Sequence, residues 1–188
     1  MNSPLLSPFE FLLTTLIDLY LMAVLLRFLL QWSETDFYNP ISQFVVKATN
    51  PVLLPLRRVV PSWKGQDIAA LVLALVLKML LVVLFGGLWT GRIGPLGVVL
   101  ESVAQLLDMA GNIFIFAIFA QAILSWIAPH GGDPLNRLLY GLTRPVLRPF
   151  RKFIPPVGGL DLTPLAAIIA LQFVKMLAVG LLRTFAVM

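Results

Sequence analysis

The amino-acid sequence predicts an all-α membrane protein with four transmembrane helices, arranged as two parallel helix–loop–helix repeats that each contain a short interfacial amphipathic helix. Three observations support this fold class. Of the 188 residues, 59% are hydrophobic and only 12% are charged, which is about half the charged fraction of an ordinary soluble domain. Four apolar stretches are long enough to cross a bilayer. The basic residues gather in two loops that resemble each other in sequence.

The four apolar stretches cover about residues 9–31, 68–89, 104–127 and 162–185. Each is close to or above the roughly 20 residues that cross about 30 Å of hydrocarbon at 1.5 Å per residue. Lipid offers no hydrogen-bond partners to the backbone, so each segment must satisfy its own peptide groups. We therefore predict a transmembrane helix at each stretch.

The basic residues predict how these helices are oriented. Four lie in the loop of residues 33–67 and five in the loop of residues 128–161, whereas the connection between the second and third stretches has only Arg92. Basic loops are retained on the cytoplasmic side of a membrane. We therefore expect a multi-pass protein of the cell inner (plasma) membrane, with both basic loops cytoplasmic and both termini periplasmic.

The chain also contains an internal repeat, which divides it into residues 9–89 and 98–185. Trp32 aligns with Trp126, 94 residues later, and the two loops then match without a gap. The recurring positions are Asn39, Pro40, Pro51, Pro55, Pro61, Gly65 and Asp67 in the first copy, and Asp133, Pro134, Pro145, Pro149, Pro155, Gly159 and Asp161 in the second. Each copy has an even number of spans, so the copies are parallel repeats.

Each loop begins with the pattern of a helix start. Asn39-Pro40 and Asp133-Pro134 are typical of an N-cap followed by proline in the first helical turn. The apolar residues that follow recur at helical spacing on one face, which predicts an amphipathic helix at the membrane interface.

The later prolines of each loop then recur every four to six residues. Proline inside a helix removes a hydrogen bond and clashes with the preceding turn. We therefore expect the amphipathic helices to end at Pro51 and Pro145 and to continue as stiff, basic, non-helical straps. Asp67 and Asp161 precede the next spans, where we expect them to act as N-caps.

The repeated pattern resembles the YggT family of small bacterial inner-membrane proteins over almost the whole chain. The residues that carry the resemblance are Trp32, Asn39-Pro40, Thr49-Asn50-Pro51, Pro55, Arg57, Pro61, Gly65 and Asp67, with their second copy from Trp126 to Asp161. Family members often have Asp-x-Ser-Pro where the loop ends. Asp161-Leu162-Thr163-Pro164 keeps that form with threonine for serine, whereas Asp67-Ile68-Ala69-Ala70 does not.

This resemblance implies membrane location but no family-wide biochemical activity. Members of the family are linked to tolerance of osmotic stress and to ion homeostasis. Relatives called YlmG are linked to cell division and, in plastids, to nucleoid organisation and cytochrome assembly.

Charged residues inside the spans form the first candidate site, because a charge in hydrocarbon is costly and often functional. Asp18 lies 14 residues before Trp32, and Lys78 lies 11 residues after Asp67. Measured from the cytoplasmic ends of their helices, their heights differ by about 4.5 Å. A lysine side chain can span that difference. We therefore expect an ion pair between Asp18 and Lys78.

The second copy offers a matching set of polar residues. Lys175 lies at the height of Asn112, so we expect Lys175 to meet Asn112, with Asp108 one turn further out towards the start of that span. Two interpretations stay open for these intramembrane groups. They hold the helices together or reach towards the membrane surface, or they line a path for an ion or a proton.

The basic loop residues form the second candidate site. Arg57, Arg58, Arg148, Arg151 and Lys152 could bind anionic lipid head groups or an acidic membrane-protein partner. Alternatively, they serve only to orient the chain. We expect no nucleic acid partner, since the tryptophans suit interface anchoring rather than base stacking. A homo-oligomer is compatible with the sequence.

Nothing in the sequence predicts an enzyme or a cofactor. Cysteine is absent and His130, the single histidine, lies in a His-Gly-Gly loop. Asp67 and Asp161 are better interpreted as helix caps than as catalytic carboxylates, because no base, nucleophile or ligand set accompanies them. The common nucleotide-binding, zinc-protease and serine-hydrolase motifs are also absent from the sequence.

Two classes of function remain. The first is a non-enzymatic membrane protein that supports osmotic-stress tolerance or ion homeostasis, for which the intramembrane charges should be needed. The second is a membrane scaffold or assembly factor in cell division or membrane-complex biogenesis, for which the basic cytoplasmic loops should be needed.

Overall fold

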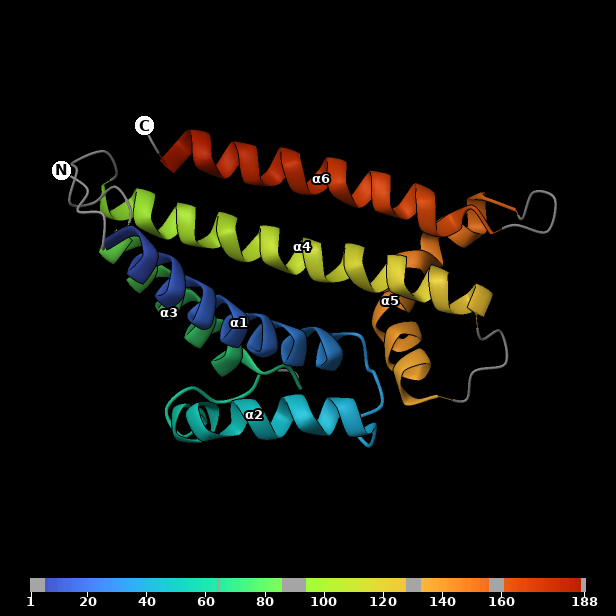
Figure 1. Cartoon of the computed structure of the whole chain (residues 1–188), viewed down its shortest axis with the longest axis horizontal. Coiled ribbons are helices and arrows are strands. Elements are labelled where there is room, and N and C mark those ends of the chain that lie inside the picture. The colour runs from blue at the N-terminus through green and yellow to red at the C-terminus, as the bar shows by residue number, and fades with distance from the viewer. Residues whose placement is uncertain (1–5, 64, 86–93, 128–132, 156–160, 187–188) are drawn as a thin grey trace.

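The computed structural model describes residues 6–63, 65–85, 94–127, 133–155 and 161–186. This part of the chain forms six helices and confirms the all-α fold class (Figure 1). The helices are α1 (Leu6–Trp32), α2 (Pro40–Arg57), α3 (Ile68–Phe85), α4 (Pro95–Ile127), α5 (Pro134–Phe153) and α6 (Thr163–Ala186). Gly159, residues 86–89 and residues 128–132 lie outside the described ranges.

Helices α1, α3, α4 and α6 are each long and apolar enough to cross a membrane, so the chain is a multi-pass membrane protein. One boundary differs from the prediction, because α4 begins at Pro95 rather than near residue 104. Glu101 and Asp108 lower the hydropathy of this first part without preventing helix formation. With 33 residues, α4 is about 50 Å long.

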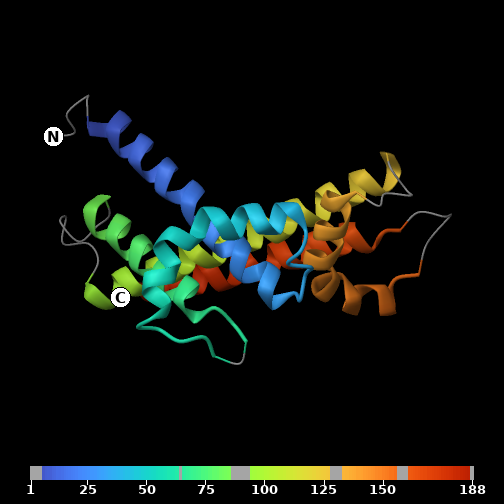
Figure 2. The same cartoon turned by 90° about the horizontal axis from the view of Figure 1, so that it is seen from below.

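The four spans form two pairs that pack against each other through α4. Helices α4 and α6 lie side by side along most of their length, while α1 and α3 form a second pair that packs against α4 (Figures 1 and 2). In Figure 1, α1 and α4 run in the same direction. This arrangement is the one expected of two parallel repeats.

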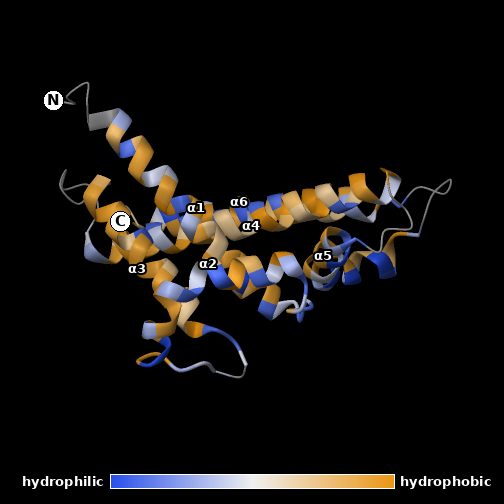
Figure 3. Ribbon diagram, turned by 60° about the horizontal axis from the view of Figure 1, so that its bottom comes forward, coloured by the Kyte–Doolittle hydropathy of each residue, from blue (hydrophilic) through white to orange (hydrophobic). Residues whose placement is uncertain are grey.

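Hydrophobic residues predominate along the spans (Figure 3), and many of the large ones are exposed. Phe11, Phe116 and Phe173 are each at least two-thirds exposed. Smaller residues fill the contacts between helices, and Ala70 and Ala74 of α3 are buried against Leu21 of α1. An apolar exterior around a close-packed interior indicates that lipid surrounds these helices.

The amphipathic helices are longer than the sequence predicted. Helix α2 continues through Pro51 and Pro55, and α5 continues through Pro145 and Pro149, so the prediction that these prolines end the helices is wrong. In each helix the two prolines are four residues apart and therefore lie on one face. Pro51 and Pro55 are exposed, so water or head groups can satisfy the carbonyls that these prolines leave without an N–H donor.

Each non-helical strap is correspondingly shorter and begins after residue 57 in the first copy and after residue 153 in the second. Pro61 and Pro155 lie within these straps and are exposed. Gly65 has a backbone φ of +78°, which favours glycine over other residues. It lies in a tight turn, where Trp63 and Gln66 pair through two backbone hydrogen bonds.

The starts of the two amphipathic helices differ. Asn39 is the N-cap of α2, and its Oδ1 accepts a hydrogen bond of 2.9 Å from the backbone N–H of Ile41. Asp133 occupies the same position before α5, but within the described chain its side chain makes no capping hydrogen bond. The predicted capping role is therefore seen in the first copy and not in the second.

The starts of the second spans also differ between copies. Asp161 Oδ1 accepts a hydrogen bond of 2.9 Å from the backbone N–H of Thr163, the first residue of α6. Asp67 immediately precedes α3, but its carboxylate binds arginine side chains instead. The prediction that Asp67 is a simple N-cap is therefore wrong.

The two repeats meet through their loops. The Asn39 side-chain amide donates a hydrogen bond of 2.6 Å to the backbone carbonyl of Pro134. Thr35 packs so closely on Gly141 of α5 that a methyl group at Gly141 would lie 2.8 Å from it. In Figure 1, α5 crosses the direction of α4 and α6, whereas α2 extends along the lower side of the bundle. The two amphipathic helices are therefore not arranged identically.

Candidate functional site

A row of polar side chains runs along one face of α4. Glu101, Gln105, Asp108 and Asn112 are spaced by four, three and four residues, which places them above one another on a helix. Helix α4 is otherwise mostly apolar and contacts the other three spans. Polar groups at this depth need partners, because hydrocarbon cannot solvate them.

The first partner comes from α3. Lys78 Nζ lies 2.7 Å from Asp18 Oδ1 of α1 and 3.2 Å from Gln105 Oε1 of α4. The structure therefore brings together the two residues that the helix heights placed side by side. The Lys78 side chain is 5% exposed, whereas that of Asp18 is 37% exposed. The lysine is buried in the bundle, and the carboxylate remains accessible on one side.

The second partner comes from α6. Lys175 Nζ lies 2.5 Å from Asn112 Oδ1 and 3.0 Å from Asp108 Oδ1, which are the two residues that the sequence placed near it. Gly111 makes this approach possible, because a Cβ at this position would lie 2.6 Å from Lys175 Cδ. The glycine therefore provides the space that the lysine side chain occupies against α4.

We expect Gly111→Ala to displace Lys175 from Asp108 and Asn112. Forcing a methyl group into a filled contact costs about 1–3 kcal/mol, and the protein should unfold at a lower SDS fraction in detergent. Gly180→Ala in the facing helix is the matched control, since no atom lies within 4 Å of a Cβ there. Equal stability of the two variants would contradict the assigned role of Gly111.

The end of the row at Glu101 and Arg183 was not predicted from the sequence. Arg183 Nε of α6 lies 3.3 Å from Glu101 Oε2, and Gln105 Nε2 donates a hydrogen bond of 2.9 Å to Glu101 Oε1. Gln105, which binds Lys78, is therefore linked through Glu101 to Arg183. The four-three-four spacing of polar residues was the signal that could have revealed the row.

A partly open cavity of about 840 Å³ lies beside this row. Its polar lining consists of Asp18, Lys78, Gln105, Asp108, Asn112 and Arg183. The rest is apolar and extends to the amphipathic helices, with residues that include Met22, Phe116, Ile41, Leu135, Leu138, Leu139 and Leu142. The row is therefore accessible from the side of the bundle.

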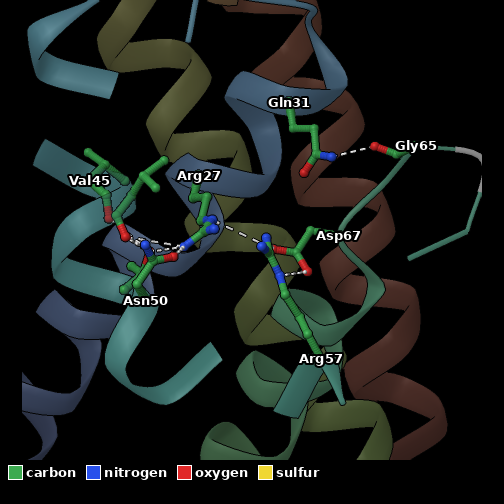
Figure 4. Close-up of polar contacts among 9 residues, drawn as sticks. Arg27, Gln31, Val45, Asn50, Arg57, Gly65 and Asp67 are labelled. Carbon is green, nitrogen blue, oxygen red and sulfur yellow. Dashed lines mark hydrogen bonds and ion pairs between the residues drawn. The ribbon is translucent and has the colours of Figure 1, made fainter. Parts of the chain in front are cut away.

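A second polar cluster lies near the loop end of the first repeat (Figure 4). Asp67 is 2% exposed and accepts hydrogen bonds from the Arg57 guanidinium, with Arg27 Nε of α1 at 3.6 Å. Arg27 also donates to Thr49 Oγ1 at 2.7 Å and to Asn50 Oδ1 at 2.8 Å. One buried arginine thus connects α1 to both α2 and α3.

The second repeat contains a weaker version of this cluster. Gln121 stands where the first copy has Arg27, and its Oε1 accepts a hydrogen bond from Thr143 Oγ1. Asp161 and Arg151 are both exposed, and among the described residues no ion pair joins them. Arg151 instead lies over the ring of Tyr140, 5.9 Å from its centroid.

The basic residues that were predicted to contact lipid head groups or a partner are thus not equivalent. Arg57 is partly buried and bound to Asp67, which leaves it less free for a head group than the sequence suggested. Arg58, Arg148, Arg151 and Lys152 are exposed on the basic loops. In the described part of the chain, no three His, Cys, Asp or Glu side chains gather in a group that could hold a metal ion.

Comparison with known proteins identifies the relatives of this arrangement. The CCB3/YggT family model matches residues 6–88 and 100–182, which are the two repeats in turn. The chain belongs to the CCB3/YggT family. No solved structure matches it.

The bacterial relatives match most of the chain. An uncharacterized protein encoded in the proC 3' region of Vibrio alginolyticus is 42% identical over 170 residues, which cover 89% of this chain and 91% of the relative. Uncharacterized protein YggT of Escherichia coli is 37% identical over 166 residues, covering 88% and 86%. A chloroplastic YlmG homolog of Arabidopsis thaliana is 36% identical over 77 residues, covering 38% and 30%. None of these names is enzymatic.

Proposed function

We propose that this member of the CCB3/YggT family is a non-enzymatic inner-membrane factor that supports ion homeostasis under osmotic stress, and that the polar row of α4 is its functional site. The observation that carries the proposal is the set of ion pairs within the spans. Asp18–Lys78, Asp108–Lys175 and Glu101–Arg183 each join two membrane helices.

Energetics favours a functional role for these groups over a purely structural one. Two charges buried together stabilise a protein no better than apolar residues of similar size, because their desolvation offsets their attraction. Apolar residues at these positions would therefore stabilise the bundle equally well. The retained charges are also accessible, since the Asp18 and Asp108 side chains are 37% and 44% exposed beside the cavity. Accessible carboxylates in a membrane provide sites where a cation can exchange.

The orientation predicted from the basic loops determines where the polar row lies in the membrane. With the basic loops on the cytoplasmic side, the polar row lies in the periplasmic half of the bundle, and the cavity extends from it towards α5. An ion that enters beside Arg183 would meet Asp18 and Asp108 in turn.

Ion flux across the membrane of liposomes that contain the protein tests this proposal. We expect the reconstituted protein to release a trapped potassium or proton gradient faster than empty liposomes. Lys175→Met should lower this rate to that of empty liposomes, because it leaves Asp108 without its counter-charge. Lys175→Arg should retain the flux, since it retains the charge. No flux from the wild-type chain, or equal flux from Lys175→Met, would overturn the proposed function.

The alternative role as a scaffold is distinguished in cells. A scaffold that acts through the basic loops needs Arg148 and Arg151, which are exposed at the end of α5. In a strain that lacks its own copy, growth at high salt should be restored by Arg148→Gln/Arg151→Gln and not by Lys175→Met. The reverse pattern would favour the scaffold.

A further inference from the structure

The cavity beside α4 has two chemically different ends. Its polar end lies at Asp18, Asp108 and Arg183, and its apolar end is formed by Leu135 and Leu139 of α5. Along α4 the lining extends from residue 105 to residue 117, which corresponds to about 18 Å. The volume of about 840 Å³ is in the range of cavities that hold one small amphiphilic molecule.

The charges that a ligand could reach at the polar end are of both signs. The side chains of Lys78 and Lys175 are only 5% and 9% exposed and are engaged by carboxylates. Asp18, Asp108 and Arg183 are 37%, 44% and 53% exposed. A ligand in the cavity therefore meets two carboxylates and one guanidinium. This combination complements a molecule that carries an ammonium and a phosphate together.

We propose that the cavity binds a zwitterionic phospholipid of the phosphoethanolamine type. The ammonium lies against Asp18 and Asp108, the phosphate receives hydrogen bonds from the Arg183 guanidinium, and one acyl chain extends past Met22 towards Leu139. Such charge-assisted bonds are among the stronger polar contacts in a medium of low dielectric constant. The lipid enters from the leaflet at the end of the bundle where α4 begins and α6 ends.

The same charges discriminate against an anionic phospholipid. The charged residues of the lining, Asp18, Asp108, Lys78 and Arg183, sum to zero. A zwitterion keeps this balance, whereas a phosphoglycerol lipid adds a negative charge beside two carboxylates and brings no cation to meet them. The proposal is independent of the ion-homeostasis function, because a lipid can occupy the cavity whether or not ions cross the bundle.

Native mass spectrometry of the full chain in detergent tests the proposal. The protein is incubated with equal amounts of a phosphatidylethanolamine and a phosphatidylglycerol that have the same acyl chains. We expect the phosphatidylethanolamine to be retained about tenfold better, the factor that one charge-assisted hydrogen bond can supply. Met22→Trp fills the cavity and should remove this retention.

Leu19→Trp is the matched control, since Leu19 is exposed on the same helix and does not line the cavity. It should retain the lipid as the wild-type chain does. Asp108→Asn/Arg183→Gln should bind both lipids equally, which tests the head group without filling the cavity. The proposal is overturned if the wild-type chain retains no phosphatidylethanolamine or shows no preference for it. Equal retention by Met22→Trp and Leu19→Trp would overturn it as well.

Discussion

Replacing Asp67 by alanine should destabilise the protein more than any other change within the loops. The carboxylate is 2% exposed and is shared by Arg27 and Arg57, so its removal leaves two neighbouring guanidinium groups without a counter-charge. Breaking a buried ion pair costs about 3–5 kcal/mol, and we expect the lower end of this range because the Arg57 side chain is 36% exposed. Titration of the detergent-solubilised protein with SDS measures the loss.

The second copy provides the control for this prediction. Asp161 aligns with Asp67, but it is exposed and makes one hydrogen bond to the backbone of Thr163. Asp161→Ala should therefore cost about 1 kcal/mol, as expected for the loss of a helix cap. If the two alanine variants were equally stable, Asp67 would not stabilise the first repeat in the way described.

Replacing Lys78 by methionine should have the second-largest effect, and a double variant should reverse it. The single change leaves Asp18 in the membrane without its ammonium partner, at a cost of about 3 kcal/mol after allowance for its exposure. Replacing both residues, as Asp18→Leu/Lys78→Met, removes both charges together. An apolar pair of similar volume is typically as stable as the ion pair, so the double variant should unfold near the wild-type SDS fraction.

The double variant also separates a structural role from a functional one. If the pair only stabilises the bundle, the double variant restores both stability and growth at high salt. The proposed role in ion homeostasis predicts that stability returns and growth does not. Restored growth in the double variant would therefore contradict the proposed function for this pair.

The sequence predicted the parts of the molecule that follow from regular helix geometry. The four spans follow from apolar length, and the Asp18–Lys78 contact follows from a constant rise of 1.5 Å per residue. Lys175 could be placed beside Asn112 for the same reason. In each case a residue's height on its helix determined which partner it could reach.

The parts that sequence reasoning missed depend on tertiary contacts. Arg27 donates hydrogen bonds to Thr49 and Asn50, which lie 22 and 23 residues further along the chain. It also lies 3.6 Å from the carboxylate of Asp67, the residue that precedes α3. No periodic pattern indicates such a cluster. Likewise, α2 was expected to end at Pro51, yet it continues through Pro55. The local rule for proline does not show that both prolines are exposed, where solvent can satisfy the backbone. Glu101 lay outside the span predicted at about residues 104–127, although in the structure it is part of α4 and Arg183 balances its charge.

Helix α4 packs against α6 of its own repeat and against α1 and α3 of the first repeat, so it connects the two repeats mechanically. Lys78 of the first repeat contacts Gln105, and Lys175 of the second contacts Asp108, so both lysines end on the same helix within one turn of each other. Because an α-helix transmits displacement as a rigid rod, a tilt of α4 caused by one repeat would shift the polar contacts of the other. The two repeats would then respond together to a displacement of either one.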